Sequence, residues 1–123
     1  MIFEGDYYYS DGTFHNGRWV DDNGNGEGII KYAKGNVYKG KWKLGKPNGK
    51  GEMKYSNGSI YNGEWKHGMR NGEGVLRYRN DDVYKGNWVD DKRDGFGIFL
   101  YANGARFEGF WESDRMHGEG VLL

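Results

Sequence analysis

The sequence predicts an all-β protein: a single elongated, twisted antiparallel sheet of tandem 23-residue β-hairpin repeats, with about 11 strands. Three observations predict this fold. Five tryptophans recur every 23 residues. Glycine accounts for 23 of the 123 residues, and each glycine inside a helix costs roughly 1 kcal/mol. The large apolar side chains are mostly aromatic, with 10 Tyr, 6 Phe and 5 Trp, so a helical core of aliphatic side chains is excluded.

The rest of the sequence keeps the phase of the tryptophans. A glycine stands two residues before each Trp, paired glycines follow the Trp by seven and nine residues, and in four repeats a Tyr follows it by thirteen. The five tryptophans are Trp19, Trp42, Trp65, Trp88 and Trp111. We therefore divide the chain into a partial repeat (1–14), four full repeats numbered first to fourth (15–37, 38–60, 61–83 and 84–106) and a truncated fifth repeat (107–123).

Each repeat is predicted to contain two strands. In residues 38–42, aromatic and glycine positions alternate with lysines, which is the period of a strand with two different faces, and residues 51–55 alternate likewise. Residues 56–58, Ser-Asn-Gly, are typical of a three-residue hairpin loop that ends in a glycine with positive φ. Asp81 takes that place in the third repeat, and aspartate tolerates the conformation better than most residues.

This loop also predicts the register of the strands. With Tyr55 opposite Ser59, Lys50 lies opposite Glu64 on the face away from the tryptophans. The same rule gives four further pairs: Glu4 with Arg18, Glu27 with Lys41, Glu73 with Asn87, and Phe96 with Phe110. Opposite charges and aromatic pairs at such positions each contribute roughly 0.2–1 kcal/mol, which supports this register. Because flat sheets of many strands are unusual, we expect pronounced twist or curvature.

Composition excludes several classes of protein. The chain has no cysteine, hence no disulfide and no thiolate metal site. It shows no signal peptide and no run of about 20 apolar residues, so we expect a cytoplasmic protein. Its 18 Lys and Arg balance 18 Asp and Glu, and we expect no nucleic-acid partner.

The repeated pattern Tyr-x-Gly-x-Trp-x-x-Gly-x-x-x-Gly-x-Gly-x-x-x-Tyr-x-x-Gly resembles the MORN (membrane occupation and recognition nexus) repeat. The second repeat carries it as Tyr38, Gly40, Trp42, Gly45, Gly49, Gly51, Tyr55 and Gly58. The chain departs from it at His15 for the first Tyr, at Asp22, Asp91 and Asp114 for the middle Gly, and at Phe3 for a Gly. The aspartates stand where a turn residue is wanted.

The resemblance implies binding rather than catalysis, because similar repeats serve as interaction modules and any catalysis lies in another domain. We therefore expect no enzyme and no cofactor, but a protein-interaction scaffold, cytoskeletal or axonemal, that binds a partner segment along the sheet. A helical segment is one candidate partner. The alternative is peripheral binding to anionic phospholipid membranes.

Other motifs are weak. Residues 21–26 start like a calcium-binding EF-hand loop, but Tyr32 stands where that loop needs Glu. Residues 45–50 are one residue short of a phosphate-binding loop. The three histidines fall at three different positions of the repeat, so they predict no repeated metal or catalytic site.

Charge is segregated along the chain. Residues 31–54 hold eight lysines against Glu52 alone. One interpretation is a solvated strand face, and the other is a site for an acidic partner or anionic headgroups, at roughly 1 kcal/mol per Lys near a charged membrane. The candidate residues are Lys39, Lys41, Lys43, Lys50 and Lys54.

Two further candidate surfaces are apolar. The fourth repeat places Phe96, Ile98 and Leu100, with Phe110 opposite Phe96, on the face that is polar in most repeats, which favours a partner or self-association surface over local packing. The other is an aromatic groove for a partner helix, although sheet-stabilising packing of its rings is the competing interpretation. That groove would be lined by Tyr38, Trp42, Tyr61, Trp65, Tyr84 and Trp88. The last residue, Leu123, lies inside a predicted strand, so we expect either that the chain is cut from a longer protein or that the edge strand pairs with another subunit.

Overall fold

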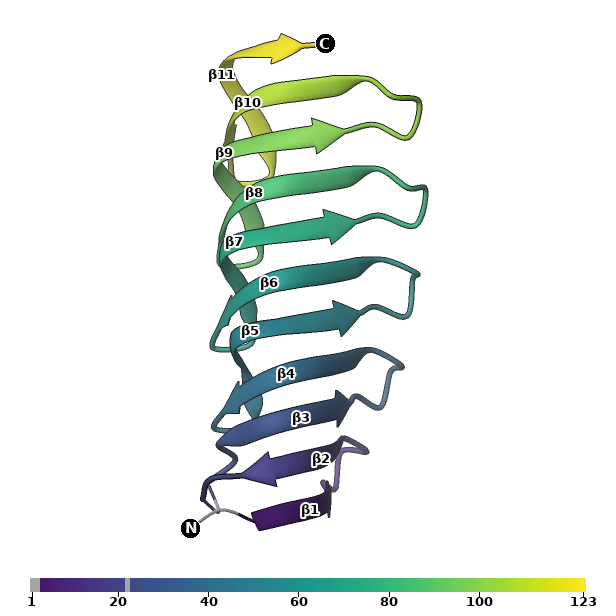
Figure 1. Ribbon diagram of the computed structural model, residues 1–123, viewed down its shortest axis with the longest axis vertical. Helices are drawn as coiled ribbons and strands as arrows, with labels where there is room; N and C mark the ends of the chain where they lie inside the picture. Colours follow the sequence, from purple (N-terminus) through teal and green to yellow (C-terminus); the bar gives the residue numbers. More distant parts are fainter. Residues whose placement is uncertain (1–2, 22) are drawn as a thin grey trace.

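The computed structural model, which describes residues 3–21 and 23–123, is one open antiparallel sheet of 11 strands in sequence order (Figure 1). The predicted fold class and strand number are confirmed. The strands are β1 (Phe3–Tyr8), β2 (Phe14–Trp19), β3 (Gly26–Lys31), β4 (Val37–Lys43), β5 (Lys46–Lys54), β6 (Ile60–Lys66), β7 (Met69–Arg77), β8 (Val83–Val89), β9 (Lys92–Leu100), β10 (Arg106–Glu112) and β11 (Arg115–Leu122). The part of the chain that the structure describes has no helix long and apolar enough to span a membrane.

The three-residue loops set the register as predicted. Tyr55 N donates to Ser59 O over 2.8 Å, and Gly58 has a φ of 94°. Asp81 adopts the same conformation, with a φ of 72°. Lys50 lies opposite Glu64, and the other four predicted pairs also face each other.

The second strand of a repeat is longer than the predicted 51–55. β5 starts at Lys46 because a bulge between Gly40 and Trp42 lets pairing continue to Lys43 opposite Lys46. Leu44 and Gly45 close this second hairpin with φ values of 51° and 76°, and two positive φ values are typical of a type I′ turn. The next three repeats contain the same hairpin, with bulges in all of them.

The core is a ladder of aromatic rings on one face of the sheet. Tyr38 is fully buried, and its ring meets the Trp65 indole of the next repeat edge to face, with centroids 5.5 Å apart. Its hydroxyl donates to Lys41 O over 2.8 Å, so the polar end is satisfied. Glycine is needed beneath the ring, since a Cβ on Gly51 would collide with it. These packed rings replace the aliphatic core of most domains.

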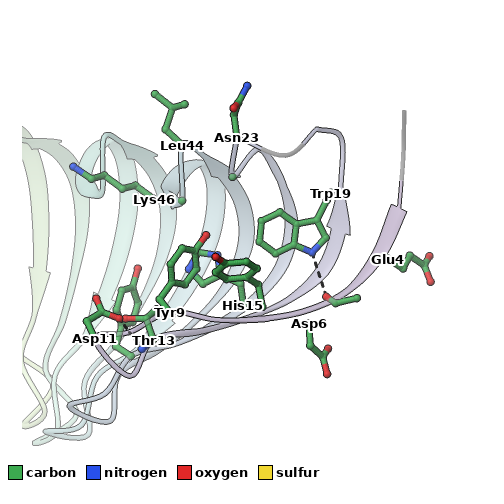
Figure 2. Close-up of a pocket in the computed structure, with 15 residues that line it drawn as sticks. Glu4, Asp6, Tyr9, Asp11, Thr13, His15, Trp19, Asn23, Leu44 and Lys46 are labelled. Atoms are coloured by element: carbon green, nitrogen blue, oxygen red, sulfur yellow. Dashed lines mark hydrogen bonds between the residues drawn. The ribbon is translucent and has the colours of Figure 1, made fainter.

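The sheet curls around this ladder, as Figure 2 shows in a view along the array. We call the concave, ring-bearing side the inner face and the convex side the outer face. Trp19 and His15 point into the curl, and the Glu4 and Asp6 carboxylates point away from it. The type I′ turns stack from repeat to repeat through backbone hydrogen bonds, such as Gly68 N to Pro47 O over 2.9 Å.

Candidate functional site

The six rings predicted to line a groove form the core instead. All of them are buried, with exposed fractions between 0% and 4%. The cause is the curl of the sheet, which packs each ring against rings of the neighbouring repeat, for example Tyr61 against Trp88 at 5.4 Å. They therefore offer a partner almost no surface. The rings that reach the inner surface include the half-buried Tyr32, Tyr55, Tyr78 and Tyr101.

Two arginines cover part of the inner face. The Arg70 guanidinium lies 4.6 Å from the centre of the Trp88 indole, and its Nε donates to the Asp91 carboxylate over 3.1 Å. Its terminal nitrogen also donates to Asp91 O over 2.9 Å. Arg93 repeats the arrangement one repeat later, 4.5 Å above Trp111 and bonded to Asp114. Each arginine thus joins its own repeat to the next.

The sequence contains a signal for these arginine–aspartate contacts, a spacing of 21 residues. Asp91 and Asp114 follow Arg70 and Arg93 by 21 residues, whereas Gly45 and Gly68 follow Gly24 and Pro47 at the same offset. The aspartates were predicted as turn residues, and their φ values of 69° and 70° agree. Their bonds to arginine are an additional role. Asp22 and the Phe3 side chain lie outside the described part of the structure.

A hollow of about 720 Å³ opens on the inner face at the first repeat (Figure 2), and we call it the first-repeat pocket. Rings wall it on several sides, and the turns around Gly24 and Gly45 close one end. His15 is only 2% exposed there, and its Nδ1 is buried with no hydrogen-bond partner among residues 3–21 and 23–123. The lining includes Tyr7, Tyr9, His15, Trp19 and Tyr32, with Asp11 and Lys46 among the charged residues.

The apolar residues of the fourth repeat lie on the outer face, as predicted. Phe96 and Phe110 are 45% and 56% exposed, and their rings meet edge to face with centroids 5.6 Å apart. Ile98 and Leu100 are partly buried beside them on β9, and Val121 of β11 is 54% exposed. We call Phe96, Ile98, Leu100, Phe110 and Val121 the apolar patch. Its aromatic surface is open to a partner.

The five candidate lysines are all exposed, and we call them the lysine stripe. The strand register places acidic residues among them: Lys41 lies opposite Glu27, Lys39 opposite Glu52, and Lys50 opposite Glu64. Lys54 Nζ also lies 4.0 Å from a Glu52 carboxylate oxygen. The stripe is therefore a mosaic of both charges, which weakens its attraction for an anionic surface.

The weak motifs gain no support from their geometry. The Asp21 carboxylate accepts from Asn23 N and from Asn25 Nδ2, at 2.9 and 2.8 Å, as in an ordinary capped turn. Within residues 3–21 and 23–123, no cluster of three or more His, Asp or Glu side chains could hold a metal ion. Self-association through the edge strands stays a prediction.

The geometry defines a class: an open solenoid-like array of hairpins, in which rings build the core and the outer surfaces remain available to partners. The MORN repeat family model matches residues 15–37, 38–60, 61–83, 84–106 and 107–123. The chain therefore belongs to the MORN repeat family, and the sequence resemblance is confirmed. The matched segments coincide with the repeats assigned from the tryptophan period.

Among solved structures, the chain is similar to the TCP domain of SAS-4 (dCPAP) of Drosophila melanogaster, which was solved in complex with a proline-rich motif of Ana2 (dSTIL). The identity is 18% and the TM-score 0.50, over 97% of this chain and 57% of that chain. This likeness shows a shared fold, and our chain spans little more than half the length of that neighbour. No curated protein matches the chain.

Proposed function

We propose that this chain is a non-catalytic, cytoplasmic protein-interaction scaffold that binds an apolar, proline-containing segment of a partner protein across the apolar patch. One observation carries the proposal: Phe96 and Phe110 are exposed where the other repeats have charged or polar residues. The residues that correspond to Phe96 are Glu4, Glu27, Lys50, Glu73 and Glu119, and those that correspond to Phe110 are Arg18, Lys41, Glu64 and Asn87.

Burial of these two rings supplies the driving force. Each square ångström of apolar surface removed from water is worth about 25 cal/mol, and contiguous exposed aromatic surface is typical of interaction sites. A proline-rich segment suits such a surface because it is already extended, loses little entropy on binding and packs its flat rings against aromatic side chains. The edge-to-face pair of Phe96 and Phe110 presents two ring surfaces at different angles.

The comparisons support a protein as the partner class. The fold neighbour was solved with a proline-rich motif of another protein, and family members are built from the same repeats. We further propose that the bound segment lies along the sheet and that the chain belongs to a cytoskeletal or axonemal assembly. A helical partner is the competing form of the same proposal.

The test is a selection from a peptide library displayed on phage, run in parallel on three proteins. The first is the natural chain. The second carries Phe96→Glu with Phe110→Asn, which installs the residues that the third repeat has at Glu73 and Asn87. The third is a matched control with Glu73→Lys and Asn87→Glu, the residues of the second repeat. All substituted residues are native at these positions in another repeat, so the variants should fold.

We expect peptides rich in apolar residues and proline to be enriched on the natural chain and on the control, and to be lost on the patch variant. A synthetic copy of an enriched peptide should bind the patch variant at least about tenfold more weakly, as expected for a hot spot. Equal binding to the patch variant, or no enrichment on the natural chain, would overturn the proposal.

Membrane binding through the lysine stripe is the second candidate, favoured by five exposed lysines on the outer face. Its test is sedimentation with vesicles of phosphatidylcholine and phosphatidylserine, compared with phosphatidylcholine alone. If the stripe binds lipid, Lys39→Glu with Lys41→Glu and Lys43→Glu should abolish sedimentation with the anionic vesicles. No sedimentation of the natural chain would rule out this candidate.

A further inference from the structure

In the third and fourth repeats, the guanidinium of Arg70 or Arg93 occupies a site on the inner face between aromatic rings and an aspartate. We call this site the guanidinium seat. Around Arg70 the seat has three aromatic walls, with ring centres 4.6 Å away for Trp88, 5.7 Å for Tyr55 and 5.9 Å for Tyr61. The Asp91 carboxylate neutralises the charge. Cations over aromatic faces are stabilised by the ring quadrupole, by about 0.5–2 kcal/mol according to exposure. The chain itself therefore shows which chemical group this seat accepts.

The first-repeat pocket is the same seat without its arginine. Two repeats before Arg70 stands Gly24, and two repeats before Asp91 stands Gly45. The two repeats share the same backbone hydrogen bond: Gly45 N donates to Gly24 O over 2.8 Å, just as Asp91 N donates to Arg70 O over 3.0 Å. Two walls correspond as well, with Tyr9 for Tyr55 and His15 for Tyr61. Trp42, the counterpart of Trp88, is buried against the Trp19 ring at 4.9 Å and lies behind the pocket lining.

The residues that line the pocket favour a positively charged ligand from another molecule. His15 is almost fully buried, and no described residue pairs with its Nδ1. Burial lowers the pKa of His15, so the imidazole is neutral at pH 7 and adds no positive charge. A hydrogen bond from Thr13 N lowers the pKa of Asp11, which is therefore ionised at the pocket. Lys46 is the opposing charge. Glu4 and Asp6 also border the pocket, but their carboxylates point to the outer side (Figure 2).

We propose that the first-repeat pocket binds the guanidinium of an arginine side chain from a partner protein, in the seat that Arg70 and Arg93 fill within the chain. The ligand stacks against the ring of Tyr9 and donates a hydrogen bond to His15 Nδ1. This pocket lies on the inner face, so it is a second site, separate from the apolar patch.

The test uses the peptide acetyl-Gly-Arg-Gly-amide and the same peptide with citrulline, which has nearly the same shape but no charge. The natural chain, labelled with ¹⁵N, is titrated with each, and NMR follows the His15 imidazole and the indole N–H signals of Trp19 and Trp42. We expect saturable shifts with the arginine peptide at millimolar concentrations and at least tenfold weaker effects with citrulline (~1.4 kcal/mol).

Three variants sharpen the test. Gly45→Asp supplies the missing carboxylate at a φ of 76°, close to the 69° of Asp91, and should tighten arginine binding about two- to fivefold. Gly68→Asp is the matched control, since Pro47 occupies that seat, and should change nothing. Arg70→Gly should open a second seat, detected at the Trp88 indole.

The absence of a saturable shift on the natural chain, or equal shifts with citrulline, would overturn the proposal. That comparison needs no variant, so a variant that fails to fold does not remove the test. A failure of the proposed function at the apolar patch can be distinguished from a failure of this second site. Phe96→Glu with Phe110→Asn should leave the arginine titration unchanged.

Discussion

The guanidinium of Arg70 lies 4.6 Å from the indole centre of Trp88 and donates from Nε to the Asp91 carboxylate over 3.1 Å. One side chain of the third repeat thus contacts the core ring and the turn of the fourth. In repeat arrays, stability depends on such interfaces between neighbours, since each repeat buries little surface alone. The stacked hairpins are therefore held together by polar contacts along the turns as well as by the ring ladder.

The energy of this contact can be measured with residues taken from other repeats. Arg70→Met installs the residue of the fifth repeat, Met116, and Asp91→Gly installs that of the second, Gly45. Arg70→Met should lower the free energy of unfolding by about 1–2 kcal/mol, because a charged hydrogen bond and a cation–π contact are lost. The double variant, followed by urea denaturation, should show a coupling of about 0.5–1 kcal/mol. Strictly additive effects would contradict the account.

Gly51→Ala should destabilise the sheet by about 1–3 kcal/mol, because the new methyl group would collide with the buried Tyr38 ring. The control is the same substitution in a Tyr38→Leu background, which removes the ring that meets the methyl group. There it should cost less than half as much in urea denaturation. An equal cost in both backgrounds would show that backbone strain, rather than the ring, requires the glycine.

The free energy of unfolding should fall at high pH, because the unfolded chain releases tyrosine protons that the folded chain retains. Burial raises the pKa of Tyr84 to about 12, from about 10 in the unfolded chain. Between these values the folded state holds the phenol proton that the unfolded state releases, so the contribution is complete below pH 10 and is lost as pH rises toward 12. Tyr84→Phe should therefore lose less stability than the natural chain between pH 9 and 11 in urea denaturation. Parallel pH curves for the two proteins would refute this assignment.

The hairpins and their register could be predicted from the sequence. The loop between Tyr55 and Ser59 has one length in every full repeat, and a shift by one residue would turn every ring outward. The pair Lys50 and Glu64 then follows by counting. A strict period supplied several independent checks of the same alignment.

Curvature of the sheet was expected, but the tight curl and the burial of the rings that follows from it could not be predicted in the same way. The bulge between Gly40 and Trp42 extends β5 to Lys46, and alternation alone does not signal a bulge. The curl then buries Tyr38 and Trp42, which a flatter sheet would have left along a groove. By contrast, the apolar patch could be predicted, because the alternation of side chains along a strand is enough to assign its residues to the outer face.

The first-repeat pocket was also out of reach of sequence reasoning. Its signal is an absence, glycine at 24 and 45 where the corresponding pairs Arg70/Asp91 and Arg93/Asp114 have arginine and aspartate. That absence has meaning only once Arg70 and Asp91 are known to touch, and their offset of 21 residues crosses two repeats. A contact of this kind becomes visible when strands of neighbouring repeats lie side by side.

The central claim, that a partner segment binds the outer face at the apolar patch, is tested most directly by ¹⁹F NMR. The chain is labelled with 4-fluorophenylalanine and titrated with a peptide enriched on the natural chain. Phe96 and Phe99 lie on opposite faces of β9, the first 45% and the second 9% exposed, so one strand carries both the probe and its control. The account predicts saturable shifts of the Phe96 and Phe110 signals while the Phe99 signal stays in place. Shifts of Phe99 without those of Phe96 and Phe110, or no shift at saturating peptide, would contradict it.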